Sequence, residues 1–192
     1  MSLNIDNRIV ILDRDGVINV DSDQYIKSPE EWRPIPGSIE SIAKLNQAGF
    51  RVFVITNQSG VAREYFSIET LHRIHQKMHD YVDRAGGKIE GILFCPHGPE
   101  DHCECRKPKS GLFEELEKTL KLSLKGAPAI GDSWRDLEAS SGVEATPILV
   151  KTGKGMKTLV ENSEALQTIL VADCLAEAVD EFILSDPGLR EE

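Results

Sequence analysis

The chain has 192 residues and a formal net charge of −10, and 40% of its residues are hydrophobic. This size and composition favour one soluble globular domain, and no apolar run reaches the roughly 20 residues that a membrane span needs. The acidic balance argues against sequence-independent nucleic-acid binding, although a local basic pocket can still bind a small anion.

We predict a single domain over residues 1–185 and a polar tail over 186–192. The first residues lack the basic start and long apolar stretch of a signal peptide, so we expect a cytoplasmic protein. No apolar stripe or heptad repeat indicates a subunit interface, and we therefore expect a monomer.

Apolar runs alternate with helical patterns along the chain. Strands are predicted over 8–12, 51–55, 89–94, 128–132 and 146–151, and helices over 37–48, 67–85, 112–122, 136–141 and 175–184. Ser38 and Ser67 are the predicted N-caps of the first two helices. This alternation predicts an α/β fold with a Rossmann-like, doubly wound parallel sheet. The irregular segment 21–36 follows the first strand, so we expect it to border the site.

Polar residues stand where three of the predicted strands end. Asp13 and Asp15 follow the first strand, Thr56 follows the second, and Asp132 follows the fourth. In open α/β sheets, ligands bind beyond the carboxyl ends of the strands, so these side chains are expected to meet there. A basic pair, Arg106 and Lys107, precedes the helix predicted from residue 112.

This set resembles the four motifs of the haloacid-dehalogenase-like phosphohydrolases, in the same order along residues 8–152. The resemblance implies that Asp13 is a nucleophile and that Asp15 is a general acid and base. It also implies that Thr56 and Lys107 bind the phosphoryl group. Mg²⁺ would be held by the carboxylates of Asp13 and Asp132 and by the backbone carbonyl of Asp15, and Asp136 would orient Lys107 or a metal-bound water.

Three cysteines and two histidines lie within residues 95–105. Three thiolates and one imidazole form a closed structural zinc site, and we expect the ligands to be Cys95, His97, Cys103 and Cys105. His102 is the competing imidazole. A zinc ion here would rigidify the loop and fix Arg106 and Lys107, without taking part in the chemistry.

Within the superfamily, this loop resembles that of the heptose bisphosphate phosphatases and of the phosphatase domain of histidinol-phosphate phosphatase, compact members without a large cap domain. The first two motifs favour the heptose branch. That resemblance implies removal of the 7-phosphate of D-glycero-D-manno-heptose 1,7-bisphosphate, in supply of heptose for lipopolysaccharide. It places these substrate-binding residues around the sugar: Asn19, Asp21, Ser22, Asp23, Gln24, Asn57, Gln58, Ser59 and Arg106. We assign Arg63 to the second phosphate, because a guanidinium can bind it bidentately.

Three alternatives remain: a histidinol-phosphate phosphatase, a non-catalytic zinc-stabilised binding module, and an enzyme that repairs phosphorylated nucleic-acid ends. The negative charge counts against the last of these. The histidines at positions 72, 75 and 79 share helical spacing, but we expect ordinary helix residues rather than a metal site. The segment 151–155 lacks the full pattern of a phosphate-binding P-loop.

Overall fold

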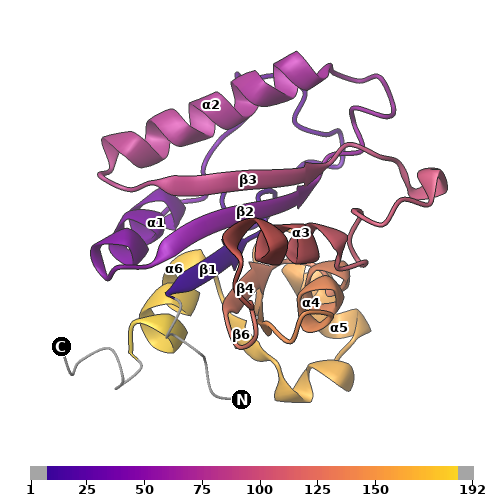
Figure 1. The fold of residues 1–192 in the computed structure, drawn as a ribbon. Coiled ribbons are helices and arrows are strands. Elements are labelled where there is room, and N and C mark those ends of the chain that lie inside the picture. Colours follow the sequence, from indigo (N-terminus) through magenta and orange to yellow (C-terminus); the bar gives the residue numbers. More distant parts are fainter. Residues whose placement is uncertain (1–7, 186–192) are drawn as a thin grey trace.

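The computed structural model describes residues 8–185, which form one six-stranded sheet in the order β3-β2-β1-β4-β5-β6 (Figure 1). All five strand pairs are parallel. The strands are β1 (Ile9–Leu12), β2 (Arg51–Asn57), β3 (Ile89–Cys95), β4 (Pro128–Gly131), β5 (Thr146–Val150) and β6 (Leu170–Ala172). This confirms the predicted doubly wound parallel sheet.

Helices cover both faces of the sheet. They are α1 (Ser38–Gln47), α2 (Ile68–Arg84), α3 (Gly111–Leu120), α4 (Trp134–Ser141), α5 (Gly155–Glu161) and α6 (Leu175–Glu177). Short 3-10 helices lie at Pro99–Asp101 and Ala165–Thr168, and a π-helical stretch, Ala178–Ile183, continues α6. None of the helices in this described part is long and apolar enough to cross a membrane.

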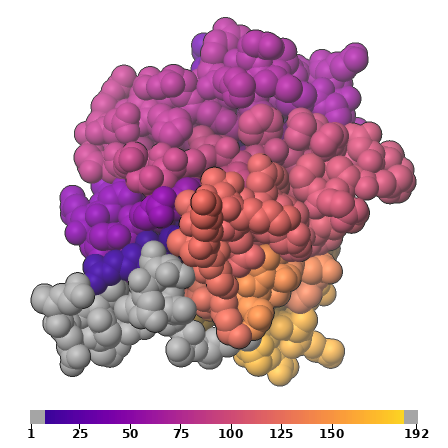
Figure 2. Space-filling view, in the orientation of Figure 1, coloured from indigo at the N-terminus to yellow at the C-terminus, as the bar shows by residue number. Residues whose placement is uncertain are grey.

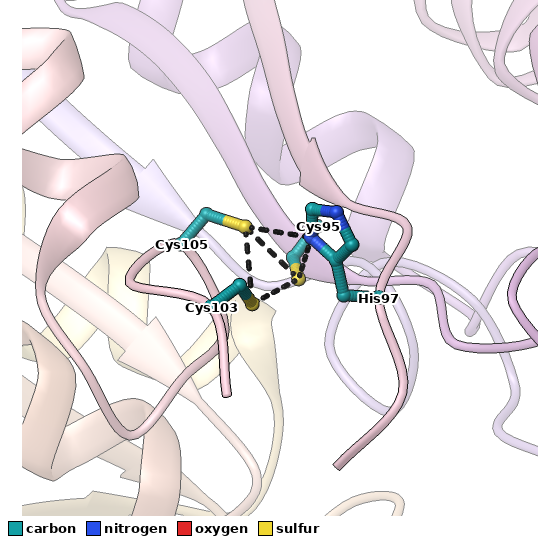
Figure 3. Close-up of side chains that lie close together, drawn as sticks. All are labelled: Cys95, His97, Cys103 and Cys105. Carbon is teal, nitrogen blue, oxygen red and sulfur yellow. Dashed lines mark hydrogen bonds between the residues drawn. The ribbon is translucent and has the colours of Figure 1, made fainter. Parts of the chain in front are cut away.

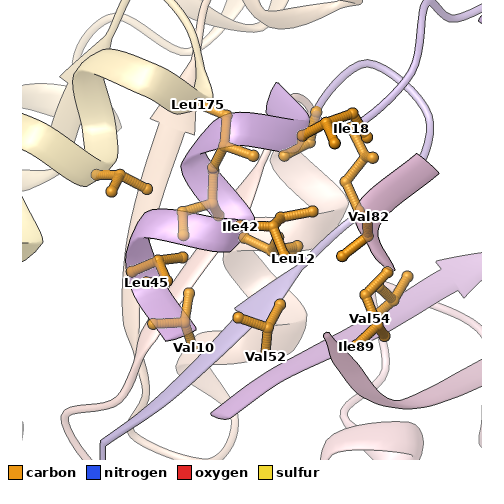
Figure 4. Packing of buried hydrophobic residues seen from close by; sticks show 14 of the residues in the cluster. Val10, Leu12, Ile18, Ile42, Leu45, Val52, Val54, Val82, Ile89 and Leu175 are labelled. Carbon is orange, nitrogen blue, oxygen red and sulfur yellow. The ribbon is translucent and has the colours of Figure 1, made fainter. Parts of the chain in front are cut away.

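Alternate residues of β1 enter two separate cores. Val10 and Leu12 pack with α1, α2 and α6 on one face (Figure 4). Ile9 and Ile11 pack with α3 and α4 on the other. All four side chains are at most 2% exposed, as expected for a strand buried on both faces. This central strand therefore fixes the position of the residues that follow it, beginning with Asp13.

The structure differs from the predicted elements at α5, at β6 and at the cap of α1. α5 and β6 were not predicted, because β6 has only three residues and α5 begins at a glycine. Ser67 does cap α2, but Ser38 does not cap α1. Gly37, at a φ of 83°, takes the cap position, and the Ser38 hydroxyl instead donates to backbone carbonyls of Ile18 and Ile35. The polar tail predicted over 186–192 lies outside the described residues.

The strand order reverses direction between β1 and β4, so a crevice is expected at the carboxyl ends of these two strands. Asp13 follows β1 and Asp132 follows β4, on the two sides of this point. The cysteine-containing loop leaves the end of β3 and projects from the side of the molecule (Figures 1 and 2).

Candidate active site

Lys107 contacts the residue that follows β1, a backbone carbonyl of β2 and a carboxylate of α4. Its ammonium group lies 2.9 Å from Asp13 Oδ1 and 2.7 Å from Asp136 Oδ1, and it donates to the backbone carbonyl of Ile55 at 2.8 Å. Only 3% of Lys107 is exposed, and the two neighbouring carboxylates keep its pKa above the usual lysine value although burial opposes this. Thr56 lies in the same cavity, almost wholly buried. The structure thus brings these sequence-predicted residues together.

Three carboxylates in this cluster could hold a divalent cation. Asp13, Asp132 and Asp136 each offer an oxygen, and these atoms all lie within 4.8 Å of one another. Burial and the neighbouring carboxylates raise the pKa of Asp13 to about 6, although Lys107 opposes the shift. Burial together with Asp13 and Asp136 raises the pKa of Asp132 to about 8. A hard cation would relieve this crowding of negative charge, so the donor set fits Mg²⁺.

Two glycines leave space for the Asp132 carboxylate. A Cβ atom at Gly16 would lie 2.0 Å from Asp132 Oδ2, and one at Gly153 would lie 2.1 Å from it. Both glycines also have positive φ angles, of 82° and 58°. The backbone N–H of Lys154 donates to Asp132 Oδ2 at 2.7 Å. The loop after β5 therefore helps to orient the Asp132 carboxylate.

Asp15 is held by three neighbouring side chains. Arg14, itself fully buried, donates to both Asp15 oxygens at 2.9 Å, and Asn19 and Gln58 each donate at 2.9 Å. Burial opposes ionisation, but Arg14 and the other donors outweigh it and hold the pKa of Asp15 below its usual value. Arg14 Nη1 also lies 3.3 Å from His75 Nε2.

Asn19 does not reach the cavity that was predicted to contain it. It is fully buried, its amide donates to Asp15 and to the Val20 carbonyl, and its oxygen accepts from the Trp32 indole N–H. Both amide hydrogens are used in these contacts, and the side chain has no surface exposed to the cavity. The structure therefore places Asn19 against Asp15 and not in the wall of the cavity, unlike most of the residues assigned to the substrate by resemblance.

The cavity above Asp13 has a volume of about 270 Å³, a size suited to a small molecule. Of the residues predicted to bind substrate, the following line it: Asp21, Ser22, Asp23, Asn57, Gln58, Ser59, Arg63 and Arg106. Gln24 lines a neighbouring cavity instead, together with Val20, Lys27 and Arg33. The segment 21–36 contributes to the wall, as predicted.

The four residues expected to bind zinc form one cluster (Figure 3). Cys95 Sγ lies 3.2 Å from Cys105 Sγ and 3.6 Å from Cys103 Sγ, and His97 Nδ1 lies 3.2 Å from Cys105 Sγ. Zn–S bonds of about 2.3 Å in a tetrahedron would place the sulfurs roughly 3.8 Å apart, close to the observed spacing. His102 does not belong to the cluster. The donor set therefore fits a closed, structural zinc ion.

The cysteine cluster is linked to the active-site lysine. Arg106 Nη1 donates to the backbone carbonyl of His97 at 3.1 Å. Asn57 donates to the Lys107 carbonyl at 3.0 Å and accepts from the Lys107 N–H at 3.1 Å. The strand β2 and the cluster therefore hold the backbone of Lys107 from two sides.

Proteins of known identity share this architecture and much of this sequence. The chain is 48% identical over 176 residues to the D-glycero-beta-D-manno-heptose-1,7-bisphosphate 7-phosphatase of Pseudomonas putida, covering 92% of this chain and 99% of the relative. The enzyme of the same name from Bordetella bronchiseptica is 46% identical, covering 89% and 96%.

The chain belongs to the heptose bisphosphate phosphatase family.

A crystal structure of the D,D-heptose 1,7-bisphosphate phosphatase from B. bronchiseptica, complexed with magnesium and phosphate, matches with a TM-score of 0.88. It is 44% identical and covers 92% of this chain and 98% of the other. The corresponding structure from Burkholderia thailandensis matches with a TM-score of 0.70, 39% identity and the same coverage. The predicted haloacid-dehalogenase type of fold, without a large cap domain, is thereby confirmed.

Two family models also match. The HAD-hydrolase-like model covers residues 104–178, and the polynucleotide kinase 3 phosphatase model covers residues 8–132. The second range ends at Asp132 and includes the first three motifs, which members of this superfamily share. Because of this match, a phosphorylated nucleic-acid end belongs in the panel of substrates to be assayed.

Sequence reasoning missed two cations in the cavity wall, Arg135 and Lys154. Arg135 lies in the first turn of α4, inside the fourth motif, and its place between Asp132 and Asp136 was the available signal. Lys154 lies in the loop after β5. From the sequence, the segment 151–155 was assigned no function despite its glycines, because it lacks the P-loop pattern.

The histidines at 72, 75 and 79 form no metal-binding group among residues 8–185. Burial, with Arg14 adding to it, lowers the pKa of His75 to about 3.

The pKa values of Asp13 and Asp132 lead to a pH prediction. A carboxyl group must lose its proton to bind Mg²⁺, so protons compete with the metal below these pKa values of about 6 and 8. We expect the apparent affinity for Mg²⁺ to rise steeply between pH 6 and pH 8, with release of protons on binding. Isothermal titration calorimetry of Mg²⁺ in buffers of different ionisation enthalpy measures both quantities. An affinity that stays constant across this range would contradict the electrostatic description of the site.

Proposed function

We propose that the protein is a Mg²⁺-dependent phosphatase that removes the 7-phosphate of D-glycero-β-D-manno-heptose 1,7-bisphosphate. The observation that carries this proposal is the contact of Lys107 with both Asp13 and Asp136 beside a cavity rich in arginine. The names of the relatives that match almost the full chain support the same substrate and the β-anomer.

Asp13 is proposed as the nucleophile. Its carboxylate would attack the phosphorus atom, form an aspartyl-phosphate and displace the sugar oxygen. Lys107 and the Thr56 hydroxyl would bind the phosphoryl oxygens in the transition state, where their charge is redistributed. Asp13 and Asp132 would hold Mg²⁺. When bound, this ion would neutralise the negative charges of the phosphate and of the carboxylates.

Asp15 is proposed to protonate the leaving sugar oxygen and then to take a proton from the attacking water. Its hydrogen bonds from Arg14, Asn19 and Gln58 favour the carboxylate, which is the form required for the second step. A phosphate dianion arriving beside it would raise its pKa by like-charge repulsion, which favours the acid required for the first step.

Asp136 is proposed to orient Lys107 rather than to bind the metal. Its oxygens already contact the Lys107 ammonium and accept from the Ser133 hydroxyl and backbone N–H. Lys107 and Arg135 hold the pKa of Asp136 below its usual value although burial opposes this. Ser133 and Asp136 also form the capping box of α4, so the helix start and the lysine are positioned together.

The zinc ion is proposed to bind at Cys95, His97, Cys103 and Cys105 and to have a structural role. Four protein ligands would fill a tetrahedral site and leave no position for substrate. We also propose that the protein is cytoplasmic and monomeric, with one domain over residues 1–185. Gel filtration with light scattering tests the monomer.

A substrate panel tests the proposed function. The values of kcat/KM for heptose 1,7-bisphosphate, histidinol phosphate and a DNA 3′-phosphate are to be measured side by side with Mg²⁺. We expect the heptose bisphosphate to be preferred over each of the others by at least about 100-fold, a difference of roughly 2.7 kcal/mol in transition-state binding. A preference for histidinol phosphate or for the DNA end would contradict the substrate, and no turnover of any would favour a binding module.

A further inference from the structure

Arg135 lies in the wall of the active-site cavity without a hydrogen-bonding partner. Its side chain is partly buried, and its Nε atom is fully buried and unpaired. Among residues 8–185, no hydrogen bond or ion pair within 4 Å involves its guanidinium group. A guanidinium offers five N–H donors, and leaving the buried Nε–H unpaired away from water is unfavourable.

The carboxylates near Arg135 are already in contact with other groups. Asp136 contacts Lys107 and Ser133, and Asp132 accepts from the backbone N–H of Lys154. These carboxylates act on Arg135 only at longer range, where they hold its pKa above the usual value although burial opposes this. The donors of Arg135 therefore remain available to a ligand that enters the cavity.

Lys154 lies on the same wall. Its ammonium group contacts Asp21 at 3.0 Å, and Arg135 is close enough to act on it electrostatically. Two cations that face one cavity at close range, with only one carboxylate in contact, are typical of an anion-binding site. Both follow the strands β4 and β5, whereas Thr56 and Lys107 lie on the β2 side of Asp13.

We propose that Arg135 and Lys154 form a subsite for the second, non-reacting phosphate of the substrate. The inference rests on the proposed function, since a sugar bisphosphate supplies that second anion. The reacting phosphoryl group has Lys107 and Thr56 as partners on the other side of Asp13. Arg63, which the sequence suggested for the second phosphate, is an exposed side chain, whereas Arg135 is partly buried and its fork of donors has no partner among the described residues.

The test compares two substrates that differ only in the second phosphate. In Arg135→Met, kcat/KM for heptose 1,7-bisphosphate is expected to fall on the order of 10- to 100-fold, the range for a charge-assisted pair. For heptose 7-phosphate, the fall should be less than about threefold. Lys154→Met should lower the ratio of the two kcat/KM values, bisphosphate over 7-phosphate, by a smaller factor. Arg135→Lys should restore part of the ratio that Arg135→Met loses.

Lys157→Met is the matched control, because Lys157 is an exposed lysine of α5 whose nearest carboxylate is Glu161, at 3.8 Å. It should leave both substrates unchanged. Calorimetry in an Asp13→Asn background gives a readout without turnover. There, Arg135→Met should weaken binding of the bisphosphate by the same factor and should leave binding of the 7-phosphate nearly unchanged. The melting temperature of Arg135→Met without substrate is measured alongside, because the nearby carboxylates interact favourably with the guanidinium charge.

Equal losses for both substrates would overturn the inference, because Arg135 would then serve the reacting group. No loss for either substrate, or a selective loss in Arg63→Met alone, would overturn it as well. Failure of the proposed function looks different: the unaltered protein itself would then show no preference for the bisphosphate over the other phosphate monoesters.

Discussion

Replacing Asp13 by asparagine is expected to lower kcat on the order of 10⁵-fold, to near the background of the assay. Asparagine has almost the same shape, but its amide is a poor nucleophile and a weak ligand for Mg²⁺. Losses of this size are typical when the attacking group of an enzyme is removed. Rapid-quench measurement of phosphate release from heptose 1,7-bisphosphate gives the rate.

The folded structure should survive this change. Lys107 keeps its contacts with Asp136 and with the Ile55 carbonyl, so its position does not depend on Asp13 alone. Asp80→Asn, on the exposed face of α2, is the matched control and should retain full activity. If Asp13→Asn retained a tenth or more of the normal kcat, Asp13 would not be the nucleophile.

Loss of His97, a proposed zinc ligand, is expected to have the second largest effect. His97→Ala should abolish stoichiometric zinc binding, lower the melting temperature by several degrees and reduce kcat/KM on the order of 100-fold. The physical reason is that the cluster holds the loop that ends at Arg106 and Lys107. Metal analysis, thermal unfolding and steady-state kinetics of one preparation measure the three quantities together.

His102→Ala is the control within the same loop. His102 is exposed and lies outside the cluster, so this variant should keep zinc, stability and activity. Cys174→Ser should behave in the same way, because Cys174 lies before α6, far from the loop along the chain. Zinc loss in His102→Ala with retention in His97→Ala would reverse the ligand assignment. Full activity without zinc would remove the link to Lys107.

The elements nearest the site could be predicted because their signals are local. Four consecutive apolar residues and a following Asp13 are enough to predict β1 and its end. The three residues of β6 give no such signal, since a strand of this length at the sheet edge is defined by its pairing with β5. Ser38 was wrongly predicted as the N-cap of α1. Its hydroxyl donates instead to the Ile18 and Ile35 carbonyls, which the local sequence pattern does not reveal.

The site was predictable where residue type and motif order both pointed to one chemistry. Lys107 and Asp13 are 94 residues apart, and only the resemblance to a family with ordered motifs predicted their contact. Asn19 was assigned to the sugar because residues 13–21 resemble the first motif of the heptose branch. Its burial depends on Trp32, thirteen residues further along. The proposed role of Arg135 in phosphate binding depends on its lack of a hydrogen-bonding partner. Only the packed structure reveals that lack.

The most direct test of the proposed reaction is a ³¹P NMR time course of the unaltered protein with heptose 1,7-bisphosphate and Mg²⁺. We expect the resonance of the 7-phosphate to disappear as inorganic phosphate appears, while the resonance of the 1-phosphate persists at full intensity. Loss of the 1-phosphate instead, or no release of phosphate at all, would contradict the account.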